Sequence, residues 1–262
     1  MSSLGLAVRD SSTMLRRNLL HMRRYPSITF FMIGIPVVLL LLFVYVFGGT
    51  LGAGLGPSGG RAQYANYLTP GILLITVAGA GQGTAIGVAM DMTEGIIARF
   101  RTMAIFRPSV LTAHVLGNLI QTLGSLAVVT VVALAVGFRP SASPIEWLAA
   151  IGLLTMISLA VIWFSVALGL VSKSVESSSN LPMPFILLPF LGSGFVPTDS
   201  MPTAFRWFAE YQPFTPVIET LRGLLLGSGI GHNGWLAIAW CVGISAVGYL
   251  WSRKLYSRDI AH

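Results

Sequence analysis

Long apolar stretches without charged residues recur along the whole chain. Six stretches of 22 to 36 residues contain no Asp, Glu, Lys or Arg. They lie between Arg24 and Arg61, Arg61 and Asp91, Arg107 and Arg139, Glu146 and Lys173, Glu176 and Asp199, and Arg222 and Arg253. A helix that crosses a bilayer needs roughly 20 predominantly apolar residues. The pattern therefore predicts an all-α integral membrane protein with six transmembrane helices.

The spans are expected at 28–47, 68–90, 111–136, 147–171, 181–197 and 234–251. The fifth differs from the others because it is short and rich in proline. Its prolines are Pro182, Pro184, Pro189 and Pro197. Proline removes a backbone hydrogen bond, and neighbouring helices must then shelter the freed carbonyl groups from lipid. We therefore expect the fifth span to be kinked or broken.

Three segments outside the spans have distinct patterns. Residues 1–26 alternate apolar side chains with arginines, which is typical of an amphipathic helix lying at the membrane interface. The loop 48–66 is glycine-rich, so we expect it to be flexible. Residues 198–233 are aromatic and proline-rich, and are predicted to form short helices that enter the outer leaflet without crossing it. Glu219 and Arg222 are three residues apart there and could pair on one helix face, as a structural ion pair or as part of a functional site.

The charge of the chain supports this topology. Hydrophobic residues make up 54% of the chain and charged residues only 10%, with a mean hydropathy of +0.78. This excludes a soluble globular enzyme, in which about 25% of residues are charged. With the N-terminus inside, 12 of the 16 Lys and Arg residues fall on the inner face. Such an excess places both termini in the cytoplasm. The net charge of +7 thus reflects topology rather than a nucleic-acid groove.

The chain offers little enzyme chemistry of its own. Cys241 is the only cysteine and the four histidines are scattered, so no metal site is expected. Residues 169–174 are the nearest approach to a phosphate-binding loop, but they lack the spacing and the second glycine of that motif. We therefore expect no catalytic residue and no ATP hydrolysis by this chain alone.

A polar stripe marks the third span. Its members recur at helical spacing: His114, Asn118, Gln121, Thr122 and Ser125. Polar groups in a span normally face the bundle interior or a wet cavity. The stripe therefore indicates either hydrogen bonds between helices or a surface that lines a substrate path or a dimer interface.

The second span contains a stripe of small residues. Gly79, Gly83 and Gly87 are four residues apart, which gives a flat face that another helix can approach closely. Gln82 lies beside this stripe and has the same two interpretations as the polar positions of the third span. We expect the glycines to serve helix packing.

The segment 91–108 is too charged to cross the bilayer and lies on the inner side. Glu94, Arg99, Arg101 and Arg107 give it charges of both signs. Such a surface suits the docking of a soluble partner through complementary charges. The alternative is a simple connecting loop.

Three sequence blocks resemble a known family. They are RRYPSITF before the first span, EGIIARFRTMAIFRPSVL between the second and third, and FLGSGFVPTDSMPTAFRWFAEYQPFTPVIETLRGLLLG from the fifth span onward. Together with six spans, they resemble the membrane subunits of type-2 ABC exporters, in particular the permeases of daunorubicin and doxorubicin resistance. The resemblance covers nearly the whole chain, residues 1–262, as a single transmembrane domain.

The resemblance implies a permease of the bacterial inner membrane that exports an amphipathic small molecule such as an antibiotic. It implies a homo- or heterodimer of permeases, each docked on a separate cytoplasmic ATP-binding subunit that holds ATP and Mg²⁺. The coupling segment of the family corresponds here to Glu94, Gly95, Arg99, Arg101 and Arg107. Three alternatives stay open: a lipid or polymer exporter of the same family, an ATP-independent channel or carrier, and a membrane protein that transports nothing.

Overall fold

The computed structural model describes residues 26–55, 60–93 and 108–258, and the regular elements in these ranges are all helical. The long elements are α2 (Pro26–Leu42), α4 (Arg61–Thr93), α6 (Pro108–Val136), α7 (Pro144–Val171) and α12 (Asn233–Arg258). The short ones are the π-helical turn η1 (Phe43–Phe47), α3 (Gly48–Ala53), α8 (Val175–Asn180), α9 (Met183–Leu187), the 3₁₀ turn η2 (Thr198–Ser200), α10 (Thr203–Tyr211) and α11 (Phe214–Leu226).

Five helices in these ranges are long and apolar enough to cross a membrane. They are Met32–Ala53, Arg61–Thr93, Val115–Val136, Pro144–Val171 and Asn233–Tyr256. The predicted spans other than the fifth each overlap one of these helices. The protein is therefore an all-helical, multi-pass membrane protein.

The expectation of a flexible loop over 48–66 is wrong for most of that range. Helix continues through α3 to Ala53, and α4 already begins at Arg61. The two helices meet so closely that a Cβ atom on Gly52 would lie 2.5 Å from the backbone oxygen of Gly60. The guanidinium of Arg61 also lies over the Tyr45 ring, 5.4 Å from its centroid. The glycines thus permit a tight helical hairpin rather than a flexible connection.

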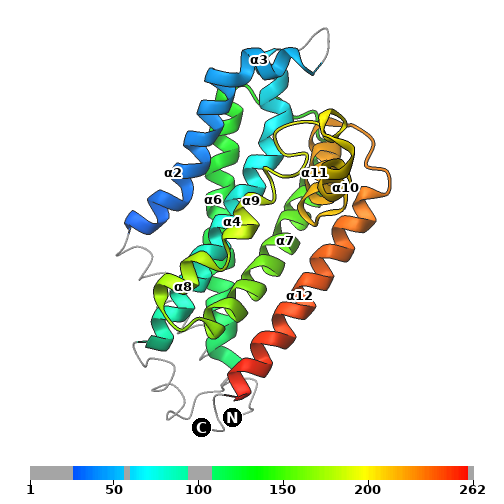
Figure 1. The fold of residues 1–262 in the computed structure, drawn as a ribbon. Helices are drawn as coiled ribbons and strands as arrows, with labels where there is room; N and C mark the ends of the chain where they lie inside the picture. Colours follow the sequence, from blue (N-terminus) through cyan, green and yellow to red (C-terminus); the bar gives the residue numbers. More distant parts are fainter. Residues whose placement is uncertain (1–25, 56–59, 94–107, 259–262) are drawn as a thin grey trace.

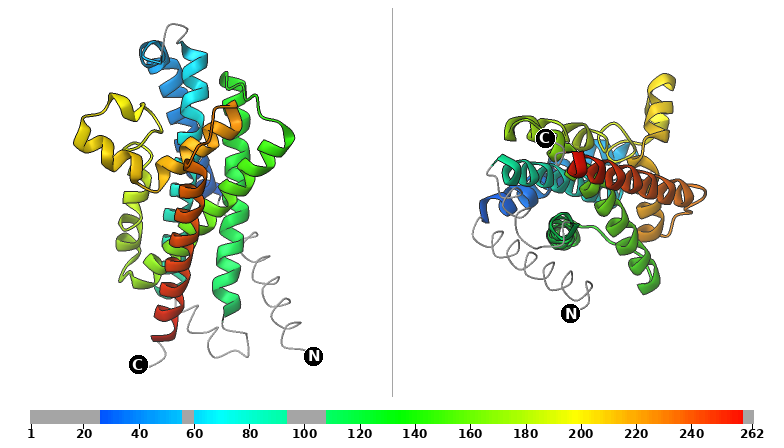
Figure 2. Two further views of the ribbon diagram at one scale, coloured as in Figure 1. Left: turned by 90° about the vertical axis from the view of Figure 1, so that its right-hand side faces the viewer. Right: turned by 90° about the horizontal axis from the view of Figure 1, so that it is seen from below.

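The predicted break in the fifth span is confirmed. Residues 181–197 contain only the five-residue helix α9, followed by turns up to Pro197. The chain nevertheless travels from the end of α7 at the bottom of Figure 1, through α8 and α9, to α10 and α11 near the top. Figure 2 shows the same rise, and shows α10 projecting sideways from the bundle.

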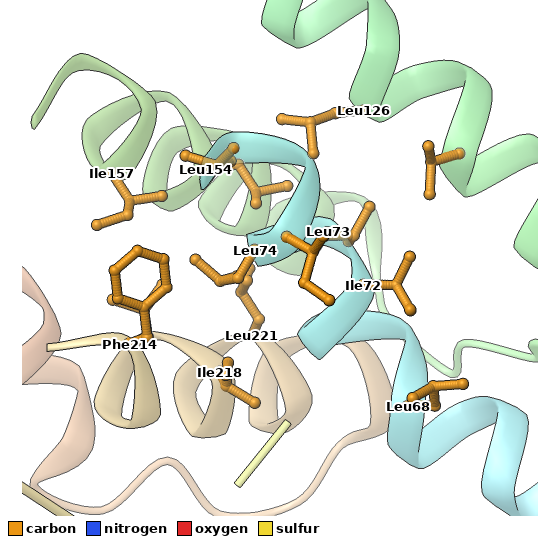
Figure 3. Packing of buried hydrophobic residues seen from close by; sticks show 14 of the residues in the cluster. Leu68, Ile72, Leu73, Leu74, Leu126, Leu154, Ile157, Phe214, Ile218 and Leu221 are labelled. Carbon is orange, nitrogen blue, oxygen red and sulfur yellow. The ribbon is translucent and has the colours of Figure 1, made fainter. Parts of the chain in front are cut away.

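Helix α4 occupies the centre of the bundle and packs against α2, α6, α7, α8 and α11. Its side chains Leu68, Ile72, Leu73 and Leu74 are almost completely buried. Figure 3 shows them within a cluster that also draws on α6, α7 and α11. The partners labelled there are Leu126, Leu154, Ile157, Phe214, Ile218 and Leu221.

Small residues set the closest helix contacts. Lipid tails are as apolar as the side chains, so helices in a membrane associate through close packing rather than through the hydrophobic effect. A Cβ atom on Gly169 of α7 would lie 2.7 Å from the backbone oxygen of Ala85 in α4. One on Gly248 of α12 would lie 2.6 Å from the backbone nitrogen of Phe164 in α7. The helices α4, α7 and α12 therefore touch backbone to backbone.

The contact at Gly169 predicts a specific loss of stability. Gly169→Ala inserts a methyl group against the backbone of α4, and overpacking of this kind costs about 1–3 kcal/mol. Gly152→Ala in the same helix is the control, because nothing lies within 4 Å of a Cβ atom there. We expect thermal unfolding in mild detergent to begin earlier for Gly169→Ala and not for Gly152→Ala. Equal unfolding temperatures would contradict the close packing of α4 and α7.

Candidate functional site: the outer polar cluster and the open face of α4

A cluster of polar side chains surrounds Arg222, which is 9% exposed. Helix α11 places Glu219 one turn before Arg222, and the two side chains form an ion pair. The guanidinium Nη2 of Arg222 donates to the backbone oxygen of Tyr67 at 3.1 Å and to that of Ser193 at 2.8 Å. It also stacks on the Tyr67 ring, 3.8 Å from the centroid. Arg222 therefore joins α11, α4 and the turn after α9.

Tyrosines of α4 add two further donors to the same turn. The Tyr67 hydroxyl donates to the backbone oxygen of Ser193 at 2.9 Å. The Tyr64 hydroxyl donates to that of Phe195 at 3.3 Å. These carbonyl groups lie beyond Pro189, in the part of the fifth segment that is not helical. Side chains of neighbouring helices thus satisfy the freed carbonyls, as the sequence predicts.

The start of α11 supports the turn from the other side. Nε2 of Gln212 donates to the backbone oxygen of Leu188 at 3.3 Å and to Oγ1 of Thr215 at 2.8 Å. The same Thr215 oxygen accepts from the backbone N–H of Ser193 at 3.3 Å. Gln212 also caps α11 by accepting from the backbone N–H of Phe214 at 2.9 Å. The turn and α11 therefore form one hydrogen-bonded unit.

The sequence identified the pairing of Glu219 with Arg222, and this interpretation is confirmed. The residues around this pair were missed. Tyr67 and Ser193 contact Arg222 directly, whereas Tyr64 and Gln212 bind the same turn through other carbonyl groups. These residues lie 10 to 158 positions before Arg222 with no regular spacing, so only the fold brings them together. The tyrosines at the start of α4 are the one sequence signal, because a tyrosine in a span usually needs a partner for its hydroxyl.

Helix α10 carries the most exposed aromatic side chains of the outer segment. Phe205, Trp207, Phe208 and Tyr211 are all exposed, Trp207 by 68%. Arg206 on this helix donates from Nε to Oε1 of Glu210 at 2.6 Å and pairs with Asp199. These two contacts raise the pKa of the Arg206 guanidinium above its ordinary value. Helix α10 is thus amphipathic, with a charged network beside its aromatic rings.

One face of α4 stays open at the other end of the bundle. Nothing lies within 4 Å of a Cβ atom on Gly79 or Gly87, and one on Gly83 would meet only Sδ of Met32 at 3.6 Å. The glycines that pack closely in α4 are instead Gly71 and Gly81. Within the described part of the chain, no helix backbone therefore approaches the stripe that the sequence singled out. Its role in helix packing stays a prediction.

Gln82 lies on the same partly exposed face. Its Nε2 donates to the backbone oxygen of Ser179 at 2.7 Å, which ties α4 to the end of α8. Helix α8 begins with Ser174, whose hydroxyl accepts from the backbone N–H of Ser177 at 3.1 Å. The open face of α4 is thus bordered by α8 on one side and by Met32 of α2 on the other.

The structure describes part of the polar stripe of α6. Oγ1 of Thr122 donates to the backbone oxygen of Asn118 within the same helix at 2.7 Å. The hydroxyl of Ser125 is buried without a hydrogen-bond partner. Gln121 is half-buried, and the side chain of His114 lies outside the described residues. These contacts favour neither interpretation of the stripe, so both stay open.

The predicted docking residues Glu94, Gly95, Arg99, Arg101 and Arg107 lie outside the described residues, as does the predicted interfacial helix 1–26 apart from Pro26. The neighbouring helices show where that segment attaches. α4 ends at Thr93 and α6 begins at Pro108, both at the bottom of Figure 1, where α7 also ends. Among the residues that the structure describes, no group of three or more His, Cys, Asp or Glu side chains is placed to hold a metal ion.

Comparison with known proteins identifies relatives of this chain. The family model described as ABC-2 type transporter matches residues 10–226. The daunorubicin resistance ABC transporter permease protein DrrB1 of Streptomyces coeruleorubidus is 25% identical over 98% of this chain and 89% of its own length. The probable doxorubicin resistance ABC transporter permease protein DrrC of Mycobacterium tuberculosis is 25% identical over 62% of this chain and 59% of its own. Nodulation protein J of Rhizobium leguminosarum is 27% identical over 74% of this chain and 76% of its own.

The geometry around Arg222 predicts that this side chain holds the outer segment in place. Arg222→Met removes one donor from the Glu219 carboxylate and from two backbone carbonyls, of which that of Ser193 keeps the Tyr67 hydroxyl. Removing one partner of a buried pair costs about 3–5 kcal/mol, and we expect the lower end of this range because Glu219 is partly exposed. Arg222→Lys keeps the charge but loses the planar fork, so we expect it to restore stability only in part.

The matched control is Arg206→Met on exposed α10, where an ion pair contributes little. Thermal unfolding of the purified protein in detergent measures all three variants. An Arg222→Met protein as stable as the control would show that Arg222 does not hold the turn.

Proposed function

This chain belongs to the ABC-2 type transporter family, and from that premise we propose that it is the permease subunit of an ATP-driven exporter of amphipathic small molecules. The family match over residues 10–226 carries the proposal. The likeness to DrrB1 over 98% of the chain supports a drug or antibiotic as the cargo. The chain is a membrane transport subunit, and the ATPase activity of such systems belongs to a separate subunit.

We propose that the chain crosses the bacterial inner membrane six times, with both termini in the cytoplasm. Five crossings are the long helices, and α8, α9 and the following turns supply the sixth, since they link opposite ends of the bundle. The excess of basic residues on the inner face supports this orientation. Helices α10 and α11 then lie in the outer leaflet, with the exposed rings of α10 at the interface that Trp and Tyr prefer.

The proposed partner on the inner side is a cytoplasmic ATP-binding subunit that holds ATP and Mg²⁺. Residues 94–107 link the inner ends of α4 and α6, so a force applied there reaches the central helix of the bundle directly. Glu94, Gly95, Arg99, Arg101 and Arg107 are the proposed docking residues. A conformational cycle requires that nucleotide and cargo prefer different states of the complex.

The proposed cargo path or dimer contact follows the open face of α4. Gly79, Gly83 and Gly87 leave room along this face, and Gln82 provides a polar group beside them. A second permease copy, identical or related, would face this surface. The polar residues of α6, namely His114, Asn118, Gln121 and Ser125, are the second candidate for the same role.

A lipid or polymer exporter of the same family is the alternative. Its permease would share the bundle and the docking segment, and would differ in the molecule that stimulates ATP hydrolysis. An ATP-independent channel or carrier is the alternative from another class. It would need no ATP-binding subunit, so the search for that subunit separates the two classes.

The open face of α4 gives a prediction for transport. Gly79→Leu and Gly87→Leu place bulk where no described residue lies within 4 Å of a Cβ atom. We expect unfolding temperatures close to the original protein and drug export reduced severalfold, measured as efflux from cells. Gly152→Leu on α7 is the control, since its Cβ atom also meets nothing within 4 Å and it lies on neither candidate path. Equal efflux for all three variants would exclude the α4 face as a path or a dimer contact.

The docking proposal is tested by purification. The tagged chain, extracted in mild detergent, is expected to retain an ATP-hydrolysing subunit, and the double variant Glu94→Lys, Arg101→Glu is expected to lose it because both local charges are reversed. Retention by the double variant would leave the permease proposal intact and rule out these docking residues. Absence of an ATPase from both preparations would favour a channel or carrier.

A further inference from the structure

A groove of about 380 Å³ runs between α7 and α12 on the outside of the bundle. Helix α7 lines it with Met156 and Trp163, among others, and α12 lines it with Cys241, Ser245 and Tyr249. The helices meet backbone to backbone at Gly248, where a Cβ atom would lie 2.6 Å from the Phe164 nitrogen. The groove therefore lies between two helices in direct contact, outside the sites considered above.

The lining is predominantly apolar and lies at membrane depth. Both helices belong to segments that can cross a bilayer. Next to the groove, α12 exposes Val242, Val247 and Leu250 by 55%, 55% and 60%. These exposed side chains are apolar and lie on a helix that can span a membrane. In a membrane they would therefore face hydrocarbon. The Trp163 and Tyr249 rings meet edge to face, 5.1 Å between centroids, and bound the groove toward the end of α12.

Basic residues continue the groove toward that end. Arg253 follows Tyr249 by four residues, so it lies on the same face of α12, about 6 Å further along the axis. Arg253 and Lys254 are exposed. Lys173 is also exposed and directly follows α7, which ends at the same end of the bundle (Figure 1). The groove therefore combines two features: an apolar surface that fits an acyl chain, and positive charge at the level of a lipid headgroup.

We propose that this groove binds one acyl chain of an anionic phospholipid, whose phosphate headgroup pairs with Arg253. Basic residues beside a cleft between spans are the chemistry that recognises anionic lipid headgroups. A lipid bound only by the folded protein stabilises it, and the stabilisation rises with the lipid concentration relative to its Kd. The bound lipid would brace α7 against α12, and the proposed orientation of the chain assigns it to the inner leaflet.

The first experiment measures thermal stabilisation of the purified chain in detergent by dioleoylphosphatidylglycerol and by dioleoylphosphatidylcholine. The original protein is expected to gain more from the anionic lipid. Arg253→Gln is expected to bind that lipid roughly fivefold more weakly, since one basic side chain contributes about 1 kcal/mol. Its response to the neutral lipid should not change. Arg61→Gln, which removes one charge at the opposite end of the bundle, is the control.

The second pair of variants tests the apolar channel. Ala246→Phe fills the groove and is expected to weaken the response to both lipids, whereas Val247→Phe on the neighbouring exposed position should not. If both variants weakened the lipid response equally, the lipid would contact the surface of α12 in general rather than this groove. That result would overturn the proposal. Stabilisation by glycerol phosphate alone, to the same extent as by the lipid, would also overturn it.

Photocrosslinking keeps the proposal testable if a variant fails to fold. Phosphatidylglycerol with a photoactivatable acyl chain, added to the unmodified protein, is expected to label peptides that contain Met156–Trp163 and Cys241–Tyr249. Labelling spread evenly over all spans would refute a defined site. Protein–protein crosslinks through this face would instead assign the groove to a second copy. None of these measurements uses transport or an ATPase, so the lipid site and the exporter function can fail independently.

Discussion

Backbone carbonyl groups at the outer end of the bundle must find hydrogen-bond donors where water is scarce. Residues 188–197 form turns instead of helix, so the carbonyl groups of Leu188, Ser193 and Phe195 lack helical partners. An unsatisfied group in hydrocarbon costs several kcal/mol. Side chains from α4, from α11 and from Gln212 just before α11 supply the donors. This requirement holds the turn and α11 against α4.

Arg222 meets this requirement with one side chain. A guanidinium presents several donors in one plane and can stack on an aromatic ring at the same time. Here it reaches two backbone carbonyls, the Glu219 carboxylate and the face of Tyr67. The charge is neutralised by Glu219, one turn away on the same helix. The buried charge of Arg222 is thus explained by the groups that surround it.

The rest of the bundle combines a tightly packed part with an open one. Helices α4, α7 and α12 touch at Gly169 and Gly248, where added side chains would collide with backbone. The opposite face of α4 touches α8 through Gln82, and no described residue lies within 4 Å of a Cβ atom on Gly79 or Gly87. The packing around the central helix is therefore asymmetric. The groove between α7 and α12 lies on the packed side, where a bound lipid would reinforce it.

The sequence by itself determined the membrane class, the helical character, the five long helices and the break at the prolines. Each follows from local chemistry, namely hydropathy over some 20 residues and the missing N–H of proline. Only the tertiary structure decided which face of α4 is buried. Gly71 and Gly81 pack closely, whereas the regularly spaced Gly79, Gly83 and Gly87 meet no other helix backbone among the described residues. The physical reason is that lipid and protein interior are both apolar, so a span carries little pattern to distinguish them. The partners of Arg222 likewise depend on contacts between residues up to 155 positions apart, which no local pattern encodes.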